Sequence, residues 1–282
     1  MNLSGNAVLA GVIGWPVRHS LSPRLHGFWL AELGIDGAYV PLAVRPEDFA
    51  QALRALPKLG FRGVNVTVPH KQAAFAAVDE KSAVAGRLGA VNTVVVGADG
   101  RLSGDNTDGY GFMQNLVVGA PGLDVKGKPV TVLGAGGAAR ASVAALTDAG
   151  AAEVRIVNRT RERAEALAQD LGGPIDPLPW DHQRSAFADT ALVVNTTSLG
   201  MAGHDPLALD LAHLPPAAVV TDIVYNPLET QLLAAARAQG NVVVDGLGML
   251  LHQARPGFEA WFGKAPEVSA ALRSHVEAGL PR

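Results

Sequence analysis

Three small residues at a fixed spacing near the middle of the chain could hold a pyrophosphate. They follow an apolar run, Pro129 to Leu133, that reads as a short buried strand. Gly134, Gly136 and Ala139 fill the positions of a G-x-G-x-x-G/A pattern. The first glycine permits a tight turn, the second lets the backbone approach the phosphates, and the alanine lets the next helix pack closely. A helix expected over roughly Ala138 to Ala149 would aim its N-terminal amides at the same anion. The sequence therefore predicts a dinucleotide-binding loop.

The residues after the next expected strand, Glu153 to Val157, indicate which dinucleotide binds. An NAD site carries Asp or Glu at this strand end, which holds the ribose 2′-hydroxyl. This chain carries Asn158, Arg159 and Thr160 instead, and Arg163 follows in the next turn. Guanidinium groups in place of a carboxylate predict binding of a 2′-phosphate, and thus of NADP(H).

The same arginines have a second interpretation as a solvated helix face. Thr160 is expected as an N-cap, which places Arg161 and Arg163 in a first helical turn, where cations oppose the helix dipole. Glu162 and Glu165 alternate with them, as on many exposed helices. Because the glycine-rich loop lies at the distance that a dinucleotide fold requires, NADP is the favoured interpretation.

The composition limits the other classes of function. The chain has 282 residues, a formal net charge of −3 and no cysteine. Disulfides, thiolate catalysis and Cys-based metal centres are therefore excluded, and no histidine pair has zinc-ligand spacing, so we expect no metal. No basic block points to nucleic acid or an anionic membrane. Without a membrane-length apolar run or a basic signal-peptide region, the expected location is the cytoplasm.

Strands and helices alternate along most of the chain, which predicts an α/β fold with parallel sheets. A hairpin is expected between residues 90–96 and 101–103, and a second α/β pattern begins near Lys128. The tail from Gly248 to Arg282 has a helical pattern and is expected to pack against the first domain.

Four polar segments interrupt the first third, each at an expected strand end or turn. Their notable residues are Ser20 and Ser22, then Asn65, Thr67 and Lys71, then Asn92, and finally Asp108. Structural roles are also open: Ser22 before Pro23 could cap a helix, Asp108 could cap another, and a lone lysine is usually solvated. Two serine hydroxyls beside a helix N-terminus nevertheless make a good carboxylate cradle.

Two further segments lie in the second half. An Asn-Pro-x-Glu run from Asn226 matches a capping box, which leaves Tyr225 to explain. Gly246 and Gly248 would allow a flat group to approach closely, and Met249 directly after them could line a nicotinamide site.

Taken together, the chain resembles shikimate dehydrogenase. The ordered segments HSLSP, NVTVPHK, GAVNT, GDNTDG, GAGGAAR, NRT, YNP and GLGMLLHQ are similar to that family's signature from Gly14 to about Phe262. The family reversibly reduces 3-dehydroshikimate to shikimate with NADPH, on the chorismate route to aromatic amino acids. The resemblance implies a substrate-binding and catalytic domain over residues 1–107, completed by 247–282, and a Rossmann-like NADP-binding domain over residues 108–246.

The resemblance also implies roles for individual residues. Lys71 and Asp108 would form the acid–base pair, since the alkoxide made by hydride transfer to a ketone needs a proton donor at the same moment. Ser20 and Ser22 would hold the substrate carboxylate, and the other substrate contacts would be Asn65, Thr67, Asn92, Tyr225 and Gln253. The cofactor contacts would be Gly134, Ala135, Gly136, Gly137, Ala138, Asn158, Arg159, Thr160, Arg163, Thr196, Gly246 and Met249.

Two alternatives accompany this expectation. One is a quinate/shikimate dehydrogenase paralogue, some of which prefer NAD; Ser22 and the Asn158–Thr160 cluster argue for the NADP branch. The other is an NADP-binding regulatory protein without catalysis, against which an intact Lys71 and Asp108 argue. The expected partner is a small-molecule substrate, and the expected assembly is a monomer or homodimer.

Overall fold

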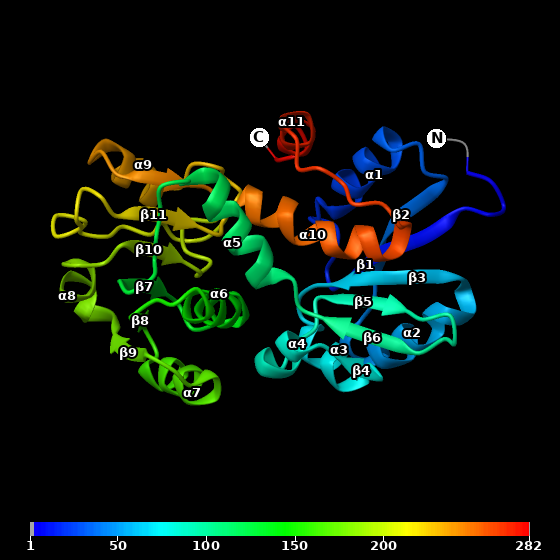
Figure 1. The fold of residues 1–282 in the computed structure, drawn as a ribbon, viewed down its shortest axis with the longest axis horizontal. Coiled ribbons are helices and arrows are strands. Elements are labelled where there is room, and N and C mark those ends of the chain that lie inside the picture. The colour runs from blue at the N-terminus through cyan, green and yellow to red at the C-terminus, as the bar shows by residue number, and fades with distance from the viewer. Residues whose placement is uncertain (1–2, 282) are drawn as a thin grey trace. The chain divides into compact units, whose positions relative to one another are not determined.

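The structure, a computed structural model that describes residues 3–281, divides into two compact units. One unit comprises the residues up to Thr107 together with those from Gln253 onward, and the other comprises Asp108–His252. Each unit contains its own six-stranded sheet with flanking helices (Figure 1). The chain passes from the first unit to the second after Thr107, and it returns to the first unit after His252, within helix α10 (Leu247–Phe262).

The sheet of the first unit is mixed. Its strands are β1 (Val8–Gly14), β2 (Gly37–Ala43), β3 (Phe61–Val66), β4 (Glu80–Lys81), β5 (Thr93–Val96) and β6 (Leu102–Asp105). They lie in the order β2-β1-β3-β5-β6-β4. Strand β1 pairs in parallel with β2 and β3, whereas β5 pairs antiparallel with β3 and β6. The β5–β6 pair is the hairpin expected from sequence, and because of it the first sheet is not wholly parallel.

The helices of the first unit surround this sheet. They are α1 (Ser22–Glu32), α2 (Phe49–Ala55), α3 (Lys71–Ala77), α4 (Ala83–Leu88) and α11 (Ala270–Glu277), with short 3-10 turns at Pro46–Asp48 and Leu56–Leu59. The expected capping role of Ser22 is wrong, because Ser22 is already the first helical residue and the N-cap position belongs to Leu21.

The C-terminal helices pack back on the first unit, as expected. Helix α11 contacts α1. The indole of Trp29 donates to the carbonyl of Glu267 at 2.8 Å, and that of Trp261 donates to the carbonyl of Val94 at 3.0 Å. Both indoles are almost fully buried, so the C-terminal residues complete the core of this unit.

The sheet of the second unit is wholly parallel. Its strands are β7 (Pro129–Leu133), β8 (Glu153–Asn158), β9 (Ile175–Pro179), β10 (Leu192–Asn195), β11 (Val219–Asp222) and β12 (Val242–Val244). They lie in the order β12-β11-β10-β7-β8-β9. This is the doubly wound order, in which the direction of winding reverses between β7 and β10. Ligands of such sheets bind at the carboxyl ends of the strands beside that reversal.

The helices of the second unit connect these strands (Figure 1). They are α5 (Asp108–Gly119), α6 (Gly137–Asp148), α7 (Arg161–Leu171), α8 (Gln183–Phe187), α9 (Gln231–Ala238) and a 3-10 turn at Trp180–His182. Helix α5 begins at Asp108 itself, so the expected cap before Gly109 is wrong. None of the helices in residues 3–281 is long and apolar enough to cross a membrane.

The capping box expected at Asn226 is also wrong. Helix α9 starts later, and its N-cap is Thr230, whose hydroxyl accepts from the amide of Leu233. The buried carboxylate of Asp222 explains the shift, because it accepts from the Thr230 hydroxyl at 2.8 Å and from the amide of Val224 at 3.0 Å. These bonds hold the intervening segment as a loop. Burial raises the pKa of Asp222, which the hydrogen bonds oppose.

Candidate active site

The glycine-rich loop joins β7 to α6 beside the winding reversal. Gly134 has a φ of +105°, and a Cβ there would lie 2.7 Å from the hydroxyl oxygen of Thr196. Only glycine therefore fits this turn. A Cβ on Gly136 or Gly137 would meet no atom within 4 Å. The backbone is thus open at the N-terminus of α6, where amides and the helix dipole favour an anion.

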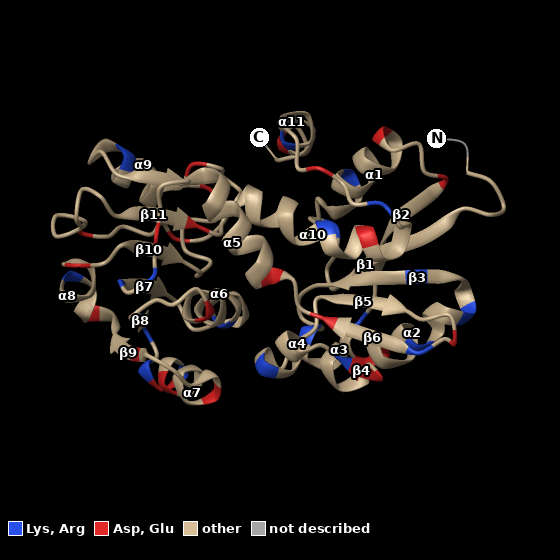
Figure 2. Ribbon diagram, viewed as in Figure 1, with Lys and Arg blue, Asp and Glu red and all other residues tan. Residues whose placement is uncertain are grey.

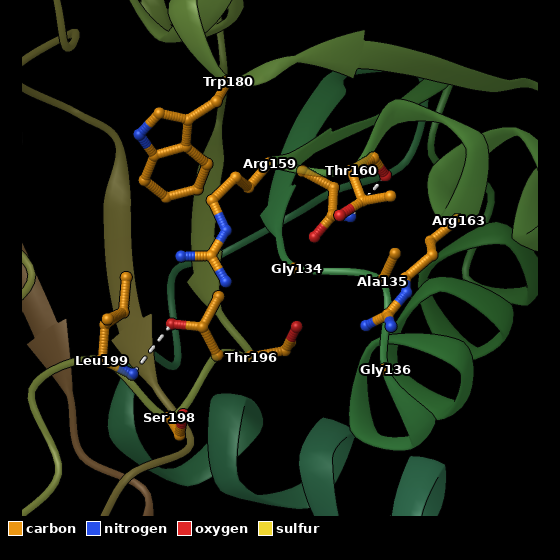
Figure 3. Close-up of a pocket in the computed structure, with 12 residues that line it drawn as sticks. Gly134, Ala135, Gly136, Arg159, Thr160, Arg163, Trp180, Thr196, Ser198 and Leu199 are labelled. Carbon is orange, nitrogen blue, oxygen red and sulfur yellow. Dashed lines mark hydrogen bonds between the residues drawn. The ribbon is translucent and has the colours of Figure 1, made fainter. Parts of the chain in front are cut away.

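A cavity of about 450 Å³ extends from this loop. The guanidinium groups of Arg159 and Arg163 both point into it, and the Trp180 ring lies beside Arg159 (Figure 3). Its lining residues are Gly134, Ala135, Gly136, Asn158, Arg159, Thr160, Arg163, Trp180, Thr196, Thr197, Ser198 and Leu199. None of these described lining residues is Asp or Glu. The cavity therefore offers cations, and no carboxylate, to a ribose 2′ substituent, which fits NADP.

The two interpretations of the arginine cluster apply to different residues. Helix α7 carries both signs of charge (Figure 2). Arg161 forms an exposed ion pair with Glu165 at 2.8 Å and is not part of the cavity lining, so it belongs to the solvated face. Arg163, two residues on, lines the cavity. Thr160 occupies the N-cap position, but its side chain makes no capping hydrogen bond.

Four cavity residues were not predicted from sequence: Trp180, Thr197, Ser198 and Leu199. The last three directly follow Thr196, the first residue after β10, and an apolar strand followed by Thr-Thr-Ser could have revealed them. Trp180 had no such signal, because it follows strand β9, which the sequence did not reveal. Conversely, Gly137, Ala138, Gly246 and Met249 were predicted as cofactor contacts and are not among the lining residues.

The glycines before and within α10 have a structural explanation. A Cβ on Gly246 would lie 2.3 Å from the carbonyl oxygen of Ile223, and one on Gly248 would lie 1.8 Å from the Asn115 amide oxygen. The groups that approach these glycines are therefore parts of the chain itself. On the side where a Cβ would stand, these glycines are therefore required by the chain's own packing; the approach of a flat ligand to them stays a prediction. Met249 is half-buried in the first turn of α10.

Three of the predicted substrate residues share one hydrogen-bond network in the first unit. The Asn65 Nδ2 donates to the backbone oxygen of Asn92 at 3.3 Å and to Thr93 Oγ1 at 3.2 Å. The Asn92 Nδ2 donates to Gln253 Oε1 at 3.1 Å, and its Oδ1 accepts from the amide of Thr107 at 2.9 Å. Thr93 and Thr107, which sequence reasoning missed, therefore connect residues from β3, the β5 region and α10.

A buried tyrosine extends this network. The Tyr39 hydroxyl donates to Asn65 Oδ1 at 2.6 Å. Burial raises the pKa of Tyr39 well above its ordinary value, and a hydrogen bond with Ser22 opposes that rise. The ring of His26 stacks on that of Tyr39 with centroids 3.8 Å apart and planes 3° apart. Neither Tyr39 nor His26 was predicted as part of a substrate site.

The remaining predicted residues lie in both units. Lys71 is the half-buried first residue of α3, and Thr67 directly follows β3. Ser20 Oγ accepts from the amide of Ser22 at 3.3 Å. Asp108 and Tyr225 belong to the second unit, and burial raises the pKa of Tyr225.

Comparison with known proteins identifies the family. Sequence profiles match residues 12–94 ("Shikimate dehydrogenase substrate binding domain"), 118–201 ("Shikimate / quinate 5-dehydrogenase") and 246–274 ("Shikimate 5'-dehydrogenase C-terminal domain"). The protein of Paramagnetospirillum magneticum named "Shikimate dehydrogenase (NADP(+))" is 60% identical over 274 residues, which cover 97% of this chain and 99% of that protein. The chain belongs to the shikimate dehydrogenase family. The resemblance found in the sequence is thereby confirmed.

Solved structures of shikimate and quinate dehydrogenases share the fold. Shikimate 5-dehydrogenase from Thermus thermophilus, solved with NADP(H) and shikimate, is 40% identical, with a TM-score of 0.85 and coverage of 97% of this chain and 100% of that one. Quinate dehydrogenase from Corynebacterium glutamicum, solved with NAD, is 34% identical, with a TM-score of 0.90 and coverage of 96% and 99%. The fold is thus common to members with different substrates and cofactors, so the choice between them depends on individual side chains.

Proposed function

We propose that this protein catalyses the reversible, NADP-dependent interconversion of 3-dehydroshikimate and shikimate. The observation that carries the proposal is the cavity at the glycine-rich loop, where Arg159 and Arg163 stand without a carboxylate. Family membership supplies the reaction, and the 60% identical relative is named for NADP(+). In this proposal the first unit binds the substrate and the second binds the cofactor, in a cytoplasmic monomer or homodimer.

The glycine-rich loop and the arginines would hold the cofactor. Gly134 makes the turn, Gly136 exposes backbone amides to the pyrophosphate, and Arg159 and Arg163 bind the 2′-phosphate through charge-assisted hydrogen bonds. When bound, NADPH supplies the hydride for the substrate carbonyl carbon. Thr196, which donates to the carbonyl of Leu133 at 2.7 Å, keeps the loop closed against β10.

Lys71 is the proposed acid–base residue. During reduction its Nζ gives a proton to the oxygen that becomes the hydroxyl, and during oxidation it takes that proton back. Asp108 would orient the ammonium group and accept a hydrogen bond from a substrate hydroxyl. A positioned donor avoids the cost of ordering a solvent molecule at the moment of hydride transfer.

The substrate residues divide by chemistry. The hydroxyl of Ser20 suits a carboxylate, because it can donate one hydrogen bond. The Ser22 hydroxyl can donate to the same carboxylate once it turns away from Tyr39, with which it forms a hydrogen bond in this structure. The other proposed contacts suit ring hydroxyls, since amides and hydroxyls both donate and accept; they are Asn65, Thr67, Asn92, Tyr225 and Gln253. The second candidate, a quinate-oxidising paralogue, is favoured only by the likeness to the C. glutamicum enzyme.

Initial rates on the purified protein test the proposal. The protein is assayed with shikimate and with quinate, each with NADP and with NAD, by following absorbance of the reduced nicotinamide. We expect the highest kcat/KM with shikimate and NADP. A higher value for quinate or NAD would establish the paralogue instead, and no turnover of any pair would establish a non-catalytic protein.

A further inference from the structure

A buried aromatic pair in the first unit has no role in the reaction described so far. Tyr39 lies in β2 and is 7% exposed, and His26 lies in α1 and is fully buried. Trp29 meets the His26 ring edge-on at 5.6 Å, and Trp261 and Phe258 also pack against it, each with ring centroids 5.8 Å away. The Tyr39 ring itself stacks on His26 at 3.8 Å and lies 6.0 Å from the Trp261 ring, so packing restrains its orientation.

The donors and acceptors around Asn65 have only one consistent arrangement. The backbone oxygen of Asn92 can only accept, so the group of Asn65 that faces it is the amide nitrogen. The amide oxygen of Asn65 then faces Tyr39, whose hydroxyl must donate. The bond to Tyr39 is 2.6 Å long, whereas the bonds from Asn65 to Asn92 and Thr93 are 3.3 Å and 3.2 Å. Tyr39 is thus the nearest partner of this side chain.

The histidine behaves as a neutral packing partner. Burial lowers the pKa of His26 to about 3. Its two ring nitrogens have no partner in good hydrogen-bond geometry within residues 3–281, and the neighbouring Asn65 side chain only opposes the fall in its pKa. The imidazole therefore stacks on the phenol without competing for the hydroxyl, which is left to Asn65 and Ser22.

We propose that Tyr39 is a positioning residue for substrate binding, which orients the Asn65 amide through the bond from its hydroxyl to Oδ1. This inference rests on the proposed function, in which Asn65 contacts a ring hydroxyl. With both amide hydrogens donated inside the protein and one lone pair taken by Tyr39, Asn65 keeps one lone pair on Oδ1. That lone pair accepts from a substrate O–H. Without Tyr39 the amide can rotate and present the wrong group.

Tyr39→Phe tests the proposal, because it removes the hydroxyl and keeps the ring that stacks on His26. We expect KM for shikimate to rise about fivefold to tenfold, the effect of roughly one hydrogen bond. The values of kcat and of KM for NADP should change by less than about twofold, because neither depends on Asn65. Combined with Asn65→Ala, Tyr39→Phe should add almost nothing to KM, since residues that act through one contact are not additive.

Trp29→Phe is the matched control. It removes a buried hydrogen bond at 2.8 Å from the same aromatic cluster and should lower thermal stability. The indole of Trp29 donates to Glu267 rather than to Asn65, and it packs on His26 rather than on Tyr39. KM for shikimate should therefore stay near the wild-type value. A KM that rises equally in Trp29→Phe would show that loosening of the core, rather than the Tyr39 hydroxyl, is responsible.

An unchanged KM in Tyr39→Phe, or a full additional effect on top of Asn65→Ala, would overturn the proposal. If Tyr39→Phe does not fold, Thr93→Val removes the partner on the opposite side of the amide and should raise KM in the same way. An unchanged KM there would equally overturn it. All variants are measured with whichever substrate pair the wild-type protein turns over, so failure of the proposed function is a separate result.

Discussion

Replacing Arg159 with alanine is expected to weaken the use of NADP and to leave the use of NAD unchanged. Arg159 points into the cavity beside Thr160, and no lining residue among those described is acidic. NAD differs from NADP only in lacking the 2′-phosphate. A side chain that contacts only this phosphate should therefore separate the two cofactors.

The size of the effect follows from the setting of the guanidinium. Hydrogen bonds to charged groups contribute about 1.5–3 kcal/mol. Arg159 is exposed at the cavity, so solvent screening favours the lower end of that range. A loss of about 1.5 kcal/mol corresponds to a roughly tenfold rise in KM for NADP. Removing Arg163 as well should bring the rise to about a hundredfold if the two contacts are independent.

Steady-state kinetics with each cofactor at saturating shikimate provide the assay. Arg161→Ala is the control, because Arg161 lies only two residues further along the chain, is paired with Glu165 and does not line the cavity. It should leave both cofactors unaffected. Equal losses with NADP and NAD in Arg159→Ala would refute the reasoning, because the arginine would then support the loop rather than bind the phosphate.

Four further outcomes are expected. Lys71→Met should lower kcat about a hundred- to ten-thousandfold with a modest change in KM; near-full kcat would assign the proton transfer to another group, such as Tyr225. Ser22→Ala should raise KM for shikimate more than it lowers kcat, and the opposite split would contradict a carboxylate contact. Trp180→Leu should raise KM for NADP and NAD alike, about three- to tenfold, because Trp180 lines the cavity and an aromatic ring packed on the adenosine part shared by both cofactors would not sense the phosphate; a selective loss would refute this. Burial lowers the pKa of His26 from 6.5 to about 3, so below pH 6.5 only the unfolded chain takes up that proton. The unfolding free energy should then fall by about 1.4 kcal/mol per pH unit as pH drops from 6.5 towards 3. His26→Phe should reduce that slope in urea unfolding at pH 7, 6 and 5, and an unchanged slope would rule out His26 as its source.

Local sequence patterns predicted most of the second unit. Strands β7 and β8 are short apolar runs with clear ends, and the loop after β7 depends on residues adjacent in the chain. Strand β9 escaped prediction because Pro177 and Pro179 lie within it. Proline has no backbone N–H to donate to a neighbouring strand, so a segment with two prolines is not predicted as a strand from sequence. The segment is tolerated here because β9 lies at the edge of the sheet.

Features that depend on distant residues were harder to predict. Asn226 had every local mark of a helix start, but the buried carboxylate of Asp222 binds Thr230 and moves the start there. Tyr39 looked like an ordinary strand residue, since its bond to Asn65 spans 26 residues and requires β2 and β3 to lie on either side of β1. Lys71 and Asn65 stood out locally as polar residues at an expected strand end, but their roles were predicted only through the family's signature.

The division of the chain also has a consequence for biosynthesis. The second unit is one continuous segment, Asp108–His252, whereas the first unit needs residues from Gln253 onward. The indole of Trp29 donates to the carbonyl of Glu267, and the carbonyl of Val94 accepts from the indole of Trp261. During synthesis the whole second unit therefore leaves the ribosome before the first unit has the C-terminal residues that complete its core. The inserted unit can fold first, and the N-terminal strands must wait, with apolar surface exposed, until the last helices emerge.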